Sequence, residues 1–263
     1  MVLGNIKKYT AELKEQFKER IAVIGDAPRL AIIQVGNLEA SNRYIKNKIK
    51  DCEEVGIIAE HYGFDNDITE VELVEEIRAI AEFADGVIVQ LPLPSHIRSS
   101  IATAAIPAEK DVDGFRADSP YAPATPGGIM KYLRACEFDL TGKDVVIIGR
   151  SNIVGKPLAA MMTAADATVT LCHSKSKLSH HLYSADLIVT AVGKPYFLNC
   201  YPIHVPVIDV GINFDENGKL VGDCFNTEGR DVTPVPGGVG LLTRCALLDN
   251  VIEAKARKCL KRE

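Results

Sequence analysis

The sequence predicts an α/β protein with parallel sheets, because short apolar runs typical of buried strands alternate with segments of helical apolar spacing. Its 263 residues, 47% of them hydrophobic and 25% charged, suffice for two hydrophobic cores. A proline- and aspartate-rich stretch at 107–126 lacks any periodicity. We therefore expect two α/β domains with a boundary near this stretch.

The first half of the chain alternates helix and strand. Apolar residues recur at helical intervals from Ile6. Ser41 is expected to cap a second helix that Gly56 ends, and Thr69 opens a third. Buried strands are expected at residues 30–35, 57–64 and 86–91. This order predicts a parallel sheet with right-handed crossovers.

The second half begins with a helix at 128–135 and continues with a strand, helix and strand that form one βαβ unit. Strands are expected at 144–148, 167–172, 187–191 and 205–210. A helix at 157–164 joins the first two of these strands, and a closing helix at 243–258 has no strand after it.

Charge excludes two classes of partner. The formal net charge of −5 and pI of 5.8 leave no basic surplus for a nucleic acid backbone or an anionic membrane.

The N-terminal segment has lysines where a secretion signal needs an apolar core, and no apolar run is long enough to span a bilayer. We expect a soluble protein that is not exported.

The cysteines and histidines do not indicate a metal site. The seven cysteines are scattered, without a closely spaced pair, so we expect buried free thiols. His180 and His181 are adjacent and lack the one-face spacing of a helical metal pair. No structural metal is predicted.

A glycine-containing turn indicates a dinucleotide site. In VVIIGRSNIVGKP, Gly149 and Gly155 lie between a strand and a helix, where small residues let backbone amides approach a pyrophosphate. The segment is not the G-x-G-x-x-G fingerprint, and a plain structural turn would explain the glycines alone about equally well. The surrounding βαβ unit favours the dinucleotide.

The end of the following strand favours NADP over NAD. NAD-binding proteins place a carboxylate there for the ribose 2′-hydroxyl, whereas this strand ends in Cys172, His173, Ser174 and Lys175. These donors, with Arg150 from the glycine turn, suit a 2′-phosphate. The alternative is that Lys175 is an ordinary solvated surface lysine.

Four polar residues are candidates for a catalytic site. Tyr44 and Lys48 are four apart, which places them on one face of the second helix. Gln90 ends a buried strand, where ligands bind in α/β proteins. Asp111 and Asp113 lie in the irregular stretch, and either could bind a ligand or face water.

Several ordered motifs give the chain a family resemblance. The motifs are S-x-x-Y-x-x-x-K at 41–48, VGI at 55–57, VQLPLP at 89–94, KDVDGF at 110–115, GRSNIVGKP at 149–157, ATVTLCHS at 167–174, VIDVGIN at 207–213 and TPVPGGVG at 233–240. In this order they resemble the bifunctional methylenetetrahydrofolate dehydrogenase/cyclohydrolases, the FolD family. The resemblance spans nearly the whole chain.

The resemblance implies a domain arrangement and an activity. A parallel α/β folate domain would comprise residues 1–118 and 244–263, with the C-terminal helix returning to it, and a Rossmann-like NADP domain would comprise 119–243. Such an enzyme oxidises 5,10-methylenetetrahydrofolate to the methenyl form and hydrolyses that product to 10-formyltetrahydrofolate. It is expected to be a cytoplasmic homodimer that acts on tetrahydrofolate derivatives.

The resemblance also implies residue roles. Lys48 would be the general acid/base, Gln90 would hydrogen-bond it, Tyr44 would orient the folate ring and Asp113 would bind the pterin. Further substrate contacts would come from Val89, Leu91, Pro236 and Gly237. Cofactor contacts would come from Gly149, Arg150, Ser151, Val154, Gly155, Pro157, His173, Ser174, Lys175, Ala191, Val192, Gly193, Gly240 and Thr243.

The chain departs from the family pattern in two places, which keeps alternative functions open. The loop at 115–126 is shorter and has Ala124 in place of a cysteine, and Leu241 and Leu242 replace a proline and a methionine. One alternative is a dehydrogenase without cyclohydrolase activity, or one that uses NAD. Another is a folate- or nucleotide-binding protein without turnover.

Overall fold

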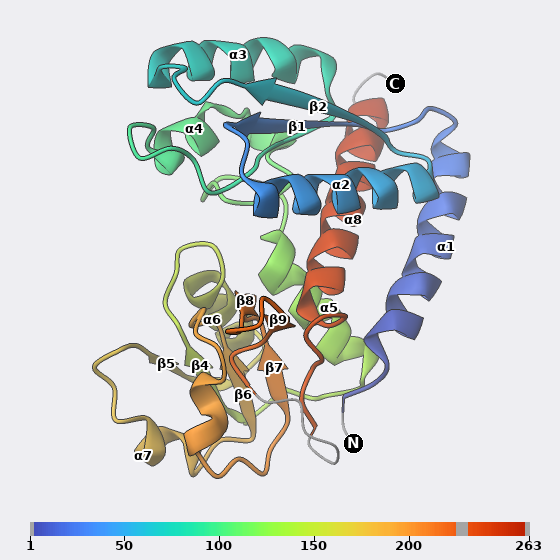
Figure 1. Cartoon of the computed structure of the whole chain (residues 1–263). Helices are drawn as coiled ribbons and strands as arrows, with labels where there is room; N and C mark the ends of the chain where they lie inside the picture. Colours follow the sequence, from blue (N-terminus) through green and yellow to red (C-terminus); the bar gives the residue numbers. More distant parts are fainter. Residues whose placement is uncertain (1–2, 225–230, 261–263) are drawn as a thin grey trace. The chain divides into compact units, whose positions relative to one another are not determined.

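The computed structural model, shown in Figure 1, describes residues 3–224 and 231–260. The chain divides into two compact units. We call Glu12–Ala124 with Arg244–Glu263 the three-stranded unit, and Met1–Ala11 with Thr125–Thr243 the four-stranded unit. The expected domains differ from these units in two ranges. Residues 1–11 belong to the four-stranded unit, and residues 119–124 belong to the three-stranded unit.

The three-stranded unit contains a parallel sheet in the order β2-β1-β3. Its strands are β1 (Arg29–Val35), β2 (Ile58–Phe64) and β3 (Gly86–Val89). Its helices include α2 (Glu39–Val55), α3 (Glu70–Phe83) and α4 (Ser99–Ala105), together with most of α1 (Ile6–Ile24) and of α8 (Val239–Leu260). In this sheet Ile33 of β1 is paired with Tyr62 on one side and Val89 on the other.

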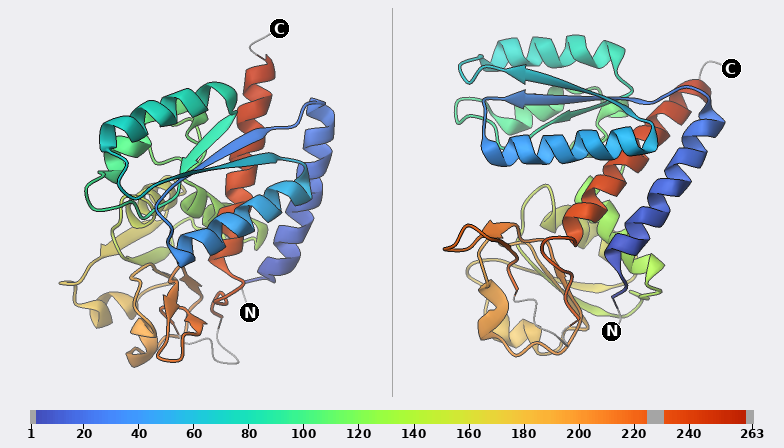
Figure 2. Two further views of the ribbon diagram at one scale, coloured as in Figure 1. Left: turned by 45° about the horizontal axis from the view of Figure 1, so that its top comes forward. Right: turned by 45° about the vertical axis from the view of Figure 1, so that its right-hand side comes forward.

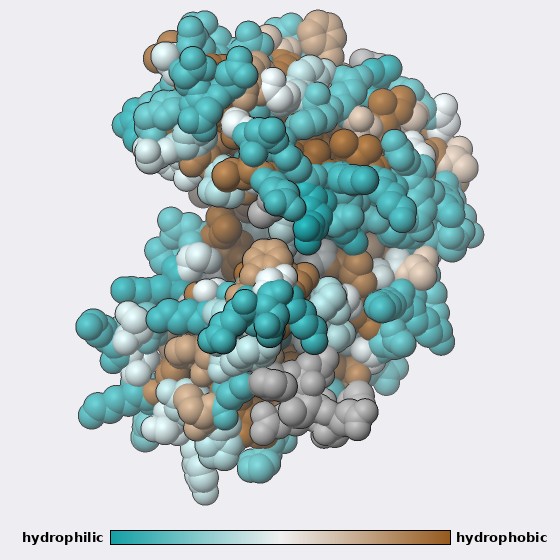
Figure 3. Space-filling view, in the orientation of Figure 1, coloured by the Kyte–Doolittle hydropathy of each residue, from teal (hydrophilic) through white to brown (hydrophobic). Residues whose placement is uncertain are grey.

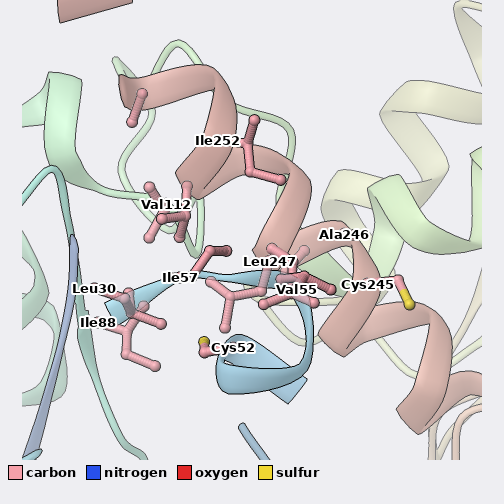
Figure 4. Packing of buried hydrophobic residues seen from close by; sticks show 14 of the residues in the cluster. Leu30, Cys52, Val55, Ile57, Ile88, Val112, Cys245, Ala246, Leu247 and Ile252 are labelled. Atoms are coloured by element: carbon pink, nitrogen blue, oxygen red, sulfur yellow. The ribbon is translucent and has the colours of Figure 1, made fainter. Parts of the chain in front are cut away.

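The central strand β1 is apolar on both faces and is buried on both, whereas the edge strand β2 is only partly covered. Leu30 and Ile32 pack with residues of α1, α2 and α8, and Figure 4 shows part of this cluster. Ala31 and Ile33 face the opposite way and pack with α3 and α4. Figure 2 shows α2 and α3 on opposite sides of the sheet, and Figure 3 shows that hydrophilic residues cover most of the outer sides of these helices. Burial on both faces explains the continuous apolar run in the sequence.

Two of the three predicted helix boundaries here are confirmed. Gly56 has φ of 91° and its amide donates to the carbonyls of Cys52 and Glu53, which ends α2. Thr69 and Glu72 form a capping box at the start of α3. The prediction that Ser41 caps α2 is wrong, because the helix begins at Glu39 and Ser41 is already buried within its first turn.

The four-stranded unit contains a second parallel sheet in the order β5-β4-β6-β7. Its strands are β4 (Asp144–Ile148), β5 (Thr168–Cys172), β6 (Leu187–Thr190) and β7 (Val207–Asp209). A small antiparallel hairpin of β8 (Asn213–Phe214) and β9 (Leu220–Val221) follows. Its helices include α6 (Gly155–Thr163), α7 (Leu178–Leu182) and all but the first residue of α5 (Ala124–Ala135).

Side chains on both faces of the second sheet are also buried. Val145 and Ile147 of β4 pack with residues of α5 and α6, whereas Val146 and Ile148 pack with α7. The fold is therefore the predicted α/β class with two parallel sheets, and α8 contributes from Arg244 onward to the core of the three-stranded unit, as expected of the C-terminal helix.

Several details differ from the sequence expectations. The 107–126 stretch contains a 3-10 helix, η1 (Ala108–Lys110), and α5 starts inside it. Helix α8 begins at Val239, four residues before the predicted start. The elements α4, α7, η2 (Phe197–Cys200) and the β8–β9 hairpin were not predicted. The three helices and the two hairpin strands are each seven residues or shorter, which leaves too little periodicity to recognise.

The cysteines match the expectation only in part. All seven are free thiols, and Cys52, Cys172, Cys224 and Cys245 are buried. Cys200 is exposed, and the remaining two are half-buried. Within the described residues, none of the helices is both long enough and apolar enough to cross a bilayer.

Candidate active site

The polar centre of the three-stranded unit is a contact between Lys48 and Gln90. Lys48 lies on α2, and its Nζ donates to Gln90 Oε1 at 3.1 Å. Gln90 directly follows β3; its Nε2 donates to the carbonyl of Leu91 at 2.7 Å, and its backbone amide to that of Ile33 at 2.8 Å. Both polar ends of the Gln90 amide are thus occupied. This fixes the oxygen toward Lys48.

Tyr44 lies one turn before Lys48 on the same helix, as the spacing predicted. Its side chain is half-buried, and burial raises the pKa of its hydroxyl against the opposing effect of Arg244. Tyr44 therefore stays neutral and presents an aromatic surface beside Lys48.

Asp113 is the carboxyl that acts on Lys48. It is buried, and burial raises its pKa while Lys48 lowers it. The loop that carries it is held by Asn250 of α8, whose Nδ2 donates to the carbonyls of Val112 at 2.8 Å and Ala122 at 3.0 Å. Asp111 is instead turned into its own loop, where it accepts from the amide of Arg116 at 2.8 Å.

The pKa of Lys48 is lowered, mainly because the half-buried ammonium loses hydration. The positive charge of Arg244 lowers it further. Asp113 and Cys52 oppose both effects, but burial is the larger influence. Lys48 thus loses its proton more easily than an ordinary lysine, which suits a group that must both accept and donate protons.

An ion-pair cluster that the sequence did not predict lies beside this lysine. Asp51, one turn after Lys48 on α2, pairs through Oδ2 with Arg244 Nε at 2.7 Å. Its Oδ1 pairs with Lys14 Nζ at the same distance. Spacing from Lys48 would have placed Asp51 on this side of the helix, but nothing in the sequence indicates that α1 and α8 bring cations to it.

The predicted dinucleotide turn lies at the carboxyl end of β4 in the four-stranded unit. Gly149 has φ of 116°, and a Cβ there would meet the carbonyl oxygen of Ala191 at 2.3 Å. A Cβ at Gly155 would meet the carbonyl oxygen of Gly149 at 1.9 Å. Neither position accepts a side chain without moving backbone, so both glycines are required by the turn.

The turn leads into α6, which starts at Gly155 and includes Pro157 near its start. Ser151 Oγ accepts from the amide of Val154 at 3.1 Å, which holds the loop, while Arg150 and Ser151 are exposed. Bare backbone, exposed donors and a helix start together fit a dinucleotide pyrophosphate.

The end of β5 carries the residues predicted to select the cofactor. His173 Nδ1 accepts from the amide of Lys175 at 3.1 Å, and Ser176 Oγ accepts from the amide of His173 at 3.0 Å. These bonds close a tight turn. Ser174 and Lys175 are exposed on it.

The remaining predicted residues of this unit fall in two groups. Ala191, Val192 and Gly193 follow β6, and the amide of Ala191 donates to Ile148 of β4 at 2.8 Å. Pro236 and Gly237 lie just before α8, and Gly240 and Thr243 lie in its first two turns. Gly237 has φ of 98°, and Thr243 Oγ1 lies 3.0 Å from Thr125 Oγ1.

Val89 and Leu91, on either side of Gln90, were both expected to contact the substrate, but their side chains differ in exposure. Val89 is buried in the core, so its side chain offers no exposed surface for a substrate contact. Leu91 is half-buried.

Among residues 3–224 and 231–260, no three histidine, cysteine or acidic side chains are grouped so as to hold a metal ion.

Two family models match the chain, one for each half. The tetrahydrofolate dehydrogenase/cyclohydrolase catalytic domain matches residues 5–113, and the tetrahydrofolate dehydrogenase/cyclohydrolase NAD(P)-binding domain matches residues 123–259.

Individual relatives cover nearly the full length. The bifunctional protein FolD of Dechloromonas aromatica is 42% identical, with 96% of each chain covered. The crystal structure of the bifunctional FolD of Campylobacter jejuni is 42% identical with a TM-score of 0.91, covering 97% of this chain and 98% of that one. The Trypanosoma brucei FolD, complexed with NADP and an inhibitor, is 29% identical with a TM-score of 0.90 over 98% of both chains. The chain therefore belongs to the tetrahydrofolate dehydrogenase/cyclohydrolase family.

Proposed function

We propose that this protein oxidises 5,10-methylenetetrahydrofolate with NADP and hydrolyses the resulting methenyl compound to 10-formyltetrahydrofolate. The observation that carries the proposal is the 3.1 Å contact between Lys48 and Gln90, beside the buried Asp113, in a chain of this family. A lysine of lowered pKa, an amide and a carboxylate provide the proton control that hydrolysis of a methenyl cation needs.

Lys48 serves as the general acid/base of the hydrolytic step. Water adds to the methenyl carbon and must lose a proton, which neutral Lys48 accepts. The bond from this carbon to one folate nitrogen then breaks as Lys48 returns its proton to that nitrogen, and the hydroxyl group on the carbon releases its own proton to water as the formyl C=O forms. A cationic substrate nearby disfavours the ammonium form further, so binding itself primes the base. Gln90 orients the amine through its fixed Oε1.

Asp113 and Tyr44 bind the substrate ring. The amino group and the ring N–H of a pterin present two parallel donors that match a carboxylate. Burial raises the pKa of Asp113, and two donors from the substrate would restore its preference for the charged form. Tyr44 packs against the ring and orients it. Leu91, Pro236, Gly237 and the backbone of Val89 are assigned to further substrate contacts.

The four-stranded unit would hold the dinucleotide, which would supply the hydride acceptor for oxidation of the one-carbon bridge. The turn of Gly149 to Gly155 and the start of α6 hold its pyrophosphate, and Ser174 and Lys175 hold the 2′-phosphate. Arg150, Ser151, Val154, Pro157, His173, Ala191, Val192, Gly193, Gly240 and Thr243 are assigned to the same cofactor. The absence of a carboxylate at 172–175 favours NADP, because a carboxylate there would repel the added phosphate.

Two assays of the purified protein test the proposal. The first follows reduction of NADP and of NAD with methylenetetrahydrofolate; the second follows loss of the near-ultraviolet absorbance of methenyltetrahydrofolate. We expect activity in both, with NADP preferred. Oxidation without hydrolysis would indicate a monofunctional dehydrogenase. Tight folate binding with neither activity would indicate a binding protein and contradict the proposal.

We further propose a homodimer in the cytoplasm, and a division of labour in which 1–118 with 244–263 forms the folate domain and 119–243 the NADP domain. The family resemblance supports these assignments. Light scattering of the purified protein tests the dimer: a mass corresponding to one chain would contradict it.

A further inference from the structure

A fully buried aspartate in the four-stranded unit has no role in the function proposed so far. Asp223 lies two residues after the end of β9 and is 0% exposed. Its Oδ2 accepts from Thr190 Oγ1 at 2.9 Å and from the amides of Val192 at 2.7 Å and Gly193 at 3.3 Å. Its Oδ1 accepts from the amide of Lys194 at 2.9 Å and from Asn213 Nδ2 at 3.0 Å. One carboxylate therefore holds three consecutive amides of a single loop.

The loop at 192–194 borders the place where a doubly wound sheet binds its ligand. In the order β5-β4-β6-β7, β4 pairs with β5 on one side and β6 on the other, so the strand order reverses between β4 and β6. Ligands bind at the carboxyl ends of the strands at such a point. Gly149 follows β4 and the loop follows β6. The 2.3 Å approach of a Cβ at Gly149 to the carbonyl of Ala191 shows that the two backbones touch.

A second carboxylate holds Asp223 itself. Asp209, at the end of β7, accepts through Oδ1 from the amide of Asp223 at 3.1 Å and through Oδ2 from that of Cys224 at 2.8 Å. Each carboxylate lies against a glycine: a Cβ at Gly211 would meet Asp223 Oδ1 at 2.3 Å, and one at Gly222 would meet Asp209 Oδ2 at 2.1 Å. The backbone is thus shaped to admit both carboxylates.

We infer that Asp223 is a positioning residue for the dinucleotide: it fixes the 192–194 loop against the Gly149 turn and thereby sets the β6 side of the cofactor site. The inference rests on the proposed use of a dinucleotide. Consecutive amides in such a loop commonly form an anion-binding concavity, and here Asp223 fills it. The amides of Val192, Gly193 and Lys194 are therefore not available to phosphate. The pyrophosphate must be bound on the β4 side, while the β6 loop contacts the uncharged parts of the cofactor.

The test compares Asp223→Asn with the unaltered protein. An asparagine side chain has one acceptor oxygen, so it cannot accept both from the donors that Asp223 Oδ1 binds and from those that Oδ2 binds. We expect the KM and the Kd for NADP to rise by about tenfold to a hundredfold, since small misplacements cost factors of this size. Methenyltetrahydrofolate hydrolysis, which consumes no dinucleotide, should be unchanged. A milder variant, Thr190→Val, removes one donor and should raise the same constants by about threefold to tenfold.

Asp215→Asn is the matched control. Asp215 also accepts backbone amides, those of Asn217 and Lys219, but in the β8–β9 hairpin. Its effect on the KM for NADP should stay within about twofold. Folded Asp223→Asn and Thr190→Val proteins with unaltered KM and Kd for NADP would overturn the inference, as would equal losses of oxidation and hydrolysis. Failure of the unaltered protein to bind NADP would overturn the proposed function and this inference with it.

Discussion

Lys48 Nζ donates to Gln90 Oε1 at 3.1 Å, and the oxygen of Gln90 is held in place by the bond from its own Nε2 to the carbonyl of Leu91. An amide is a neutral partner. It orients the lysine but offsets the cost of burying the ammonium far less than a carboxylate would, and the pKa of Lys48 stays lowered. A carboxylate at this position would have the opposite effect.

Replacing Lys48 by methionine should remove the general acid/base with little change in side-chain volume. We expect hydrolysis of methenyltetrahydrofolate to fall by about 100-fold or more, because general acid–base catalysis contributes factors of this size. The fold should be retained, since Lys48 is half-buried and leaves an apolar stem. The loss of near-ultraviolet absorbance measures the rate. Lys50→Met, on the exposed side of the same helix, is the control; equal rates in Lys48→Met and the control would refute the assignment.

Gln90→Glu should raise the pKa of Lys48, because a carboxylate about 3 Å away stabilises the ammonium form. Lys48 is neutral only above its pKa, so the rising limb of the pH–rate profile for hydrolysis should move to higher pH. We expect a change of about one pH unit or more, with a lower rate at pH 7. Gln90→Met removes the hydrogen bond without adding charge and should not move the limb upward. Identical pH profiles for the glutamate variant and the unaltered protein would show that Gln90 does not act through Lys48.

Lys175→Glu should reverse or abolish the preference for NADP. Lys175 is exposed on the turn after β5, where the 2′-phosphate is proposed to bind, and a carboxylate there would repel the phosphate and suit a 2′-hydroxyl. The ratio of kcat/KM for NADP to that for NAD should fall by at least about tenfold, which corresponds to about 1.4 kcal/mol. Lys177→Glu makes the same charge change two residues away. If both variants alter the ratio equally, Lys175 has no specific role.

Local signals predicted the fold well and long-range contacts poorly. The cap at Thr69, the stop at Gly56 and the glycine turn at Gly149 each depend on neighbouring residues, so a single segment of sequence contains the information. The apolar runs identified both sheets for the same reason. Ser41 shows the limit, since a residue with a good capping side chain lies inside the helix when the backbone bonds begin earlier.

The electrostatic surroundings of the site could not be predicted in this way. Arg244 reaches Asp51 from the last helix, and Asp223 reaches the loop after β6 from a hairpin that was not predicted. Both carboxylates look like ordinary surface residues in the sequence. Their burial and partners depend on the packing of elements far apart along the chain, and that packing decides whether a carboxylate is solvated or structural.

Asp209 should make stability depend on pH between about 4 and 7. Burial raises the pKa of its carboxyl from the ordinary value of 3.8 to about 6. The folded protein therefore binds this proton more tightly than the unfolded chain, and the stabilising contribution is present below pH 4 and lost as pH rises through about 6. The change corresponds to roughly 3 kcal/mol at most. Asp209→Asn cannot titrate, so the free energy of unfolding of the unaltered protein relative to this variant should decrease as pH rises. Urea denaturation of both proteins at several pH values measures this difference, and a difference that is constant across the range would mean that Asp209 has the same pKa in the folded and unfolded states.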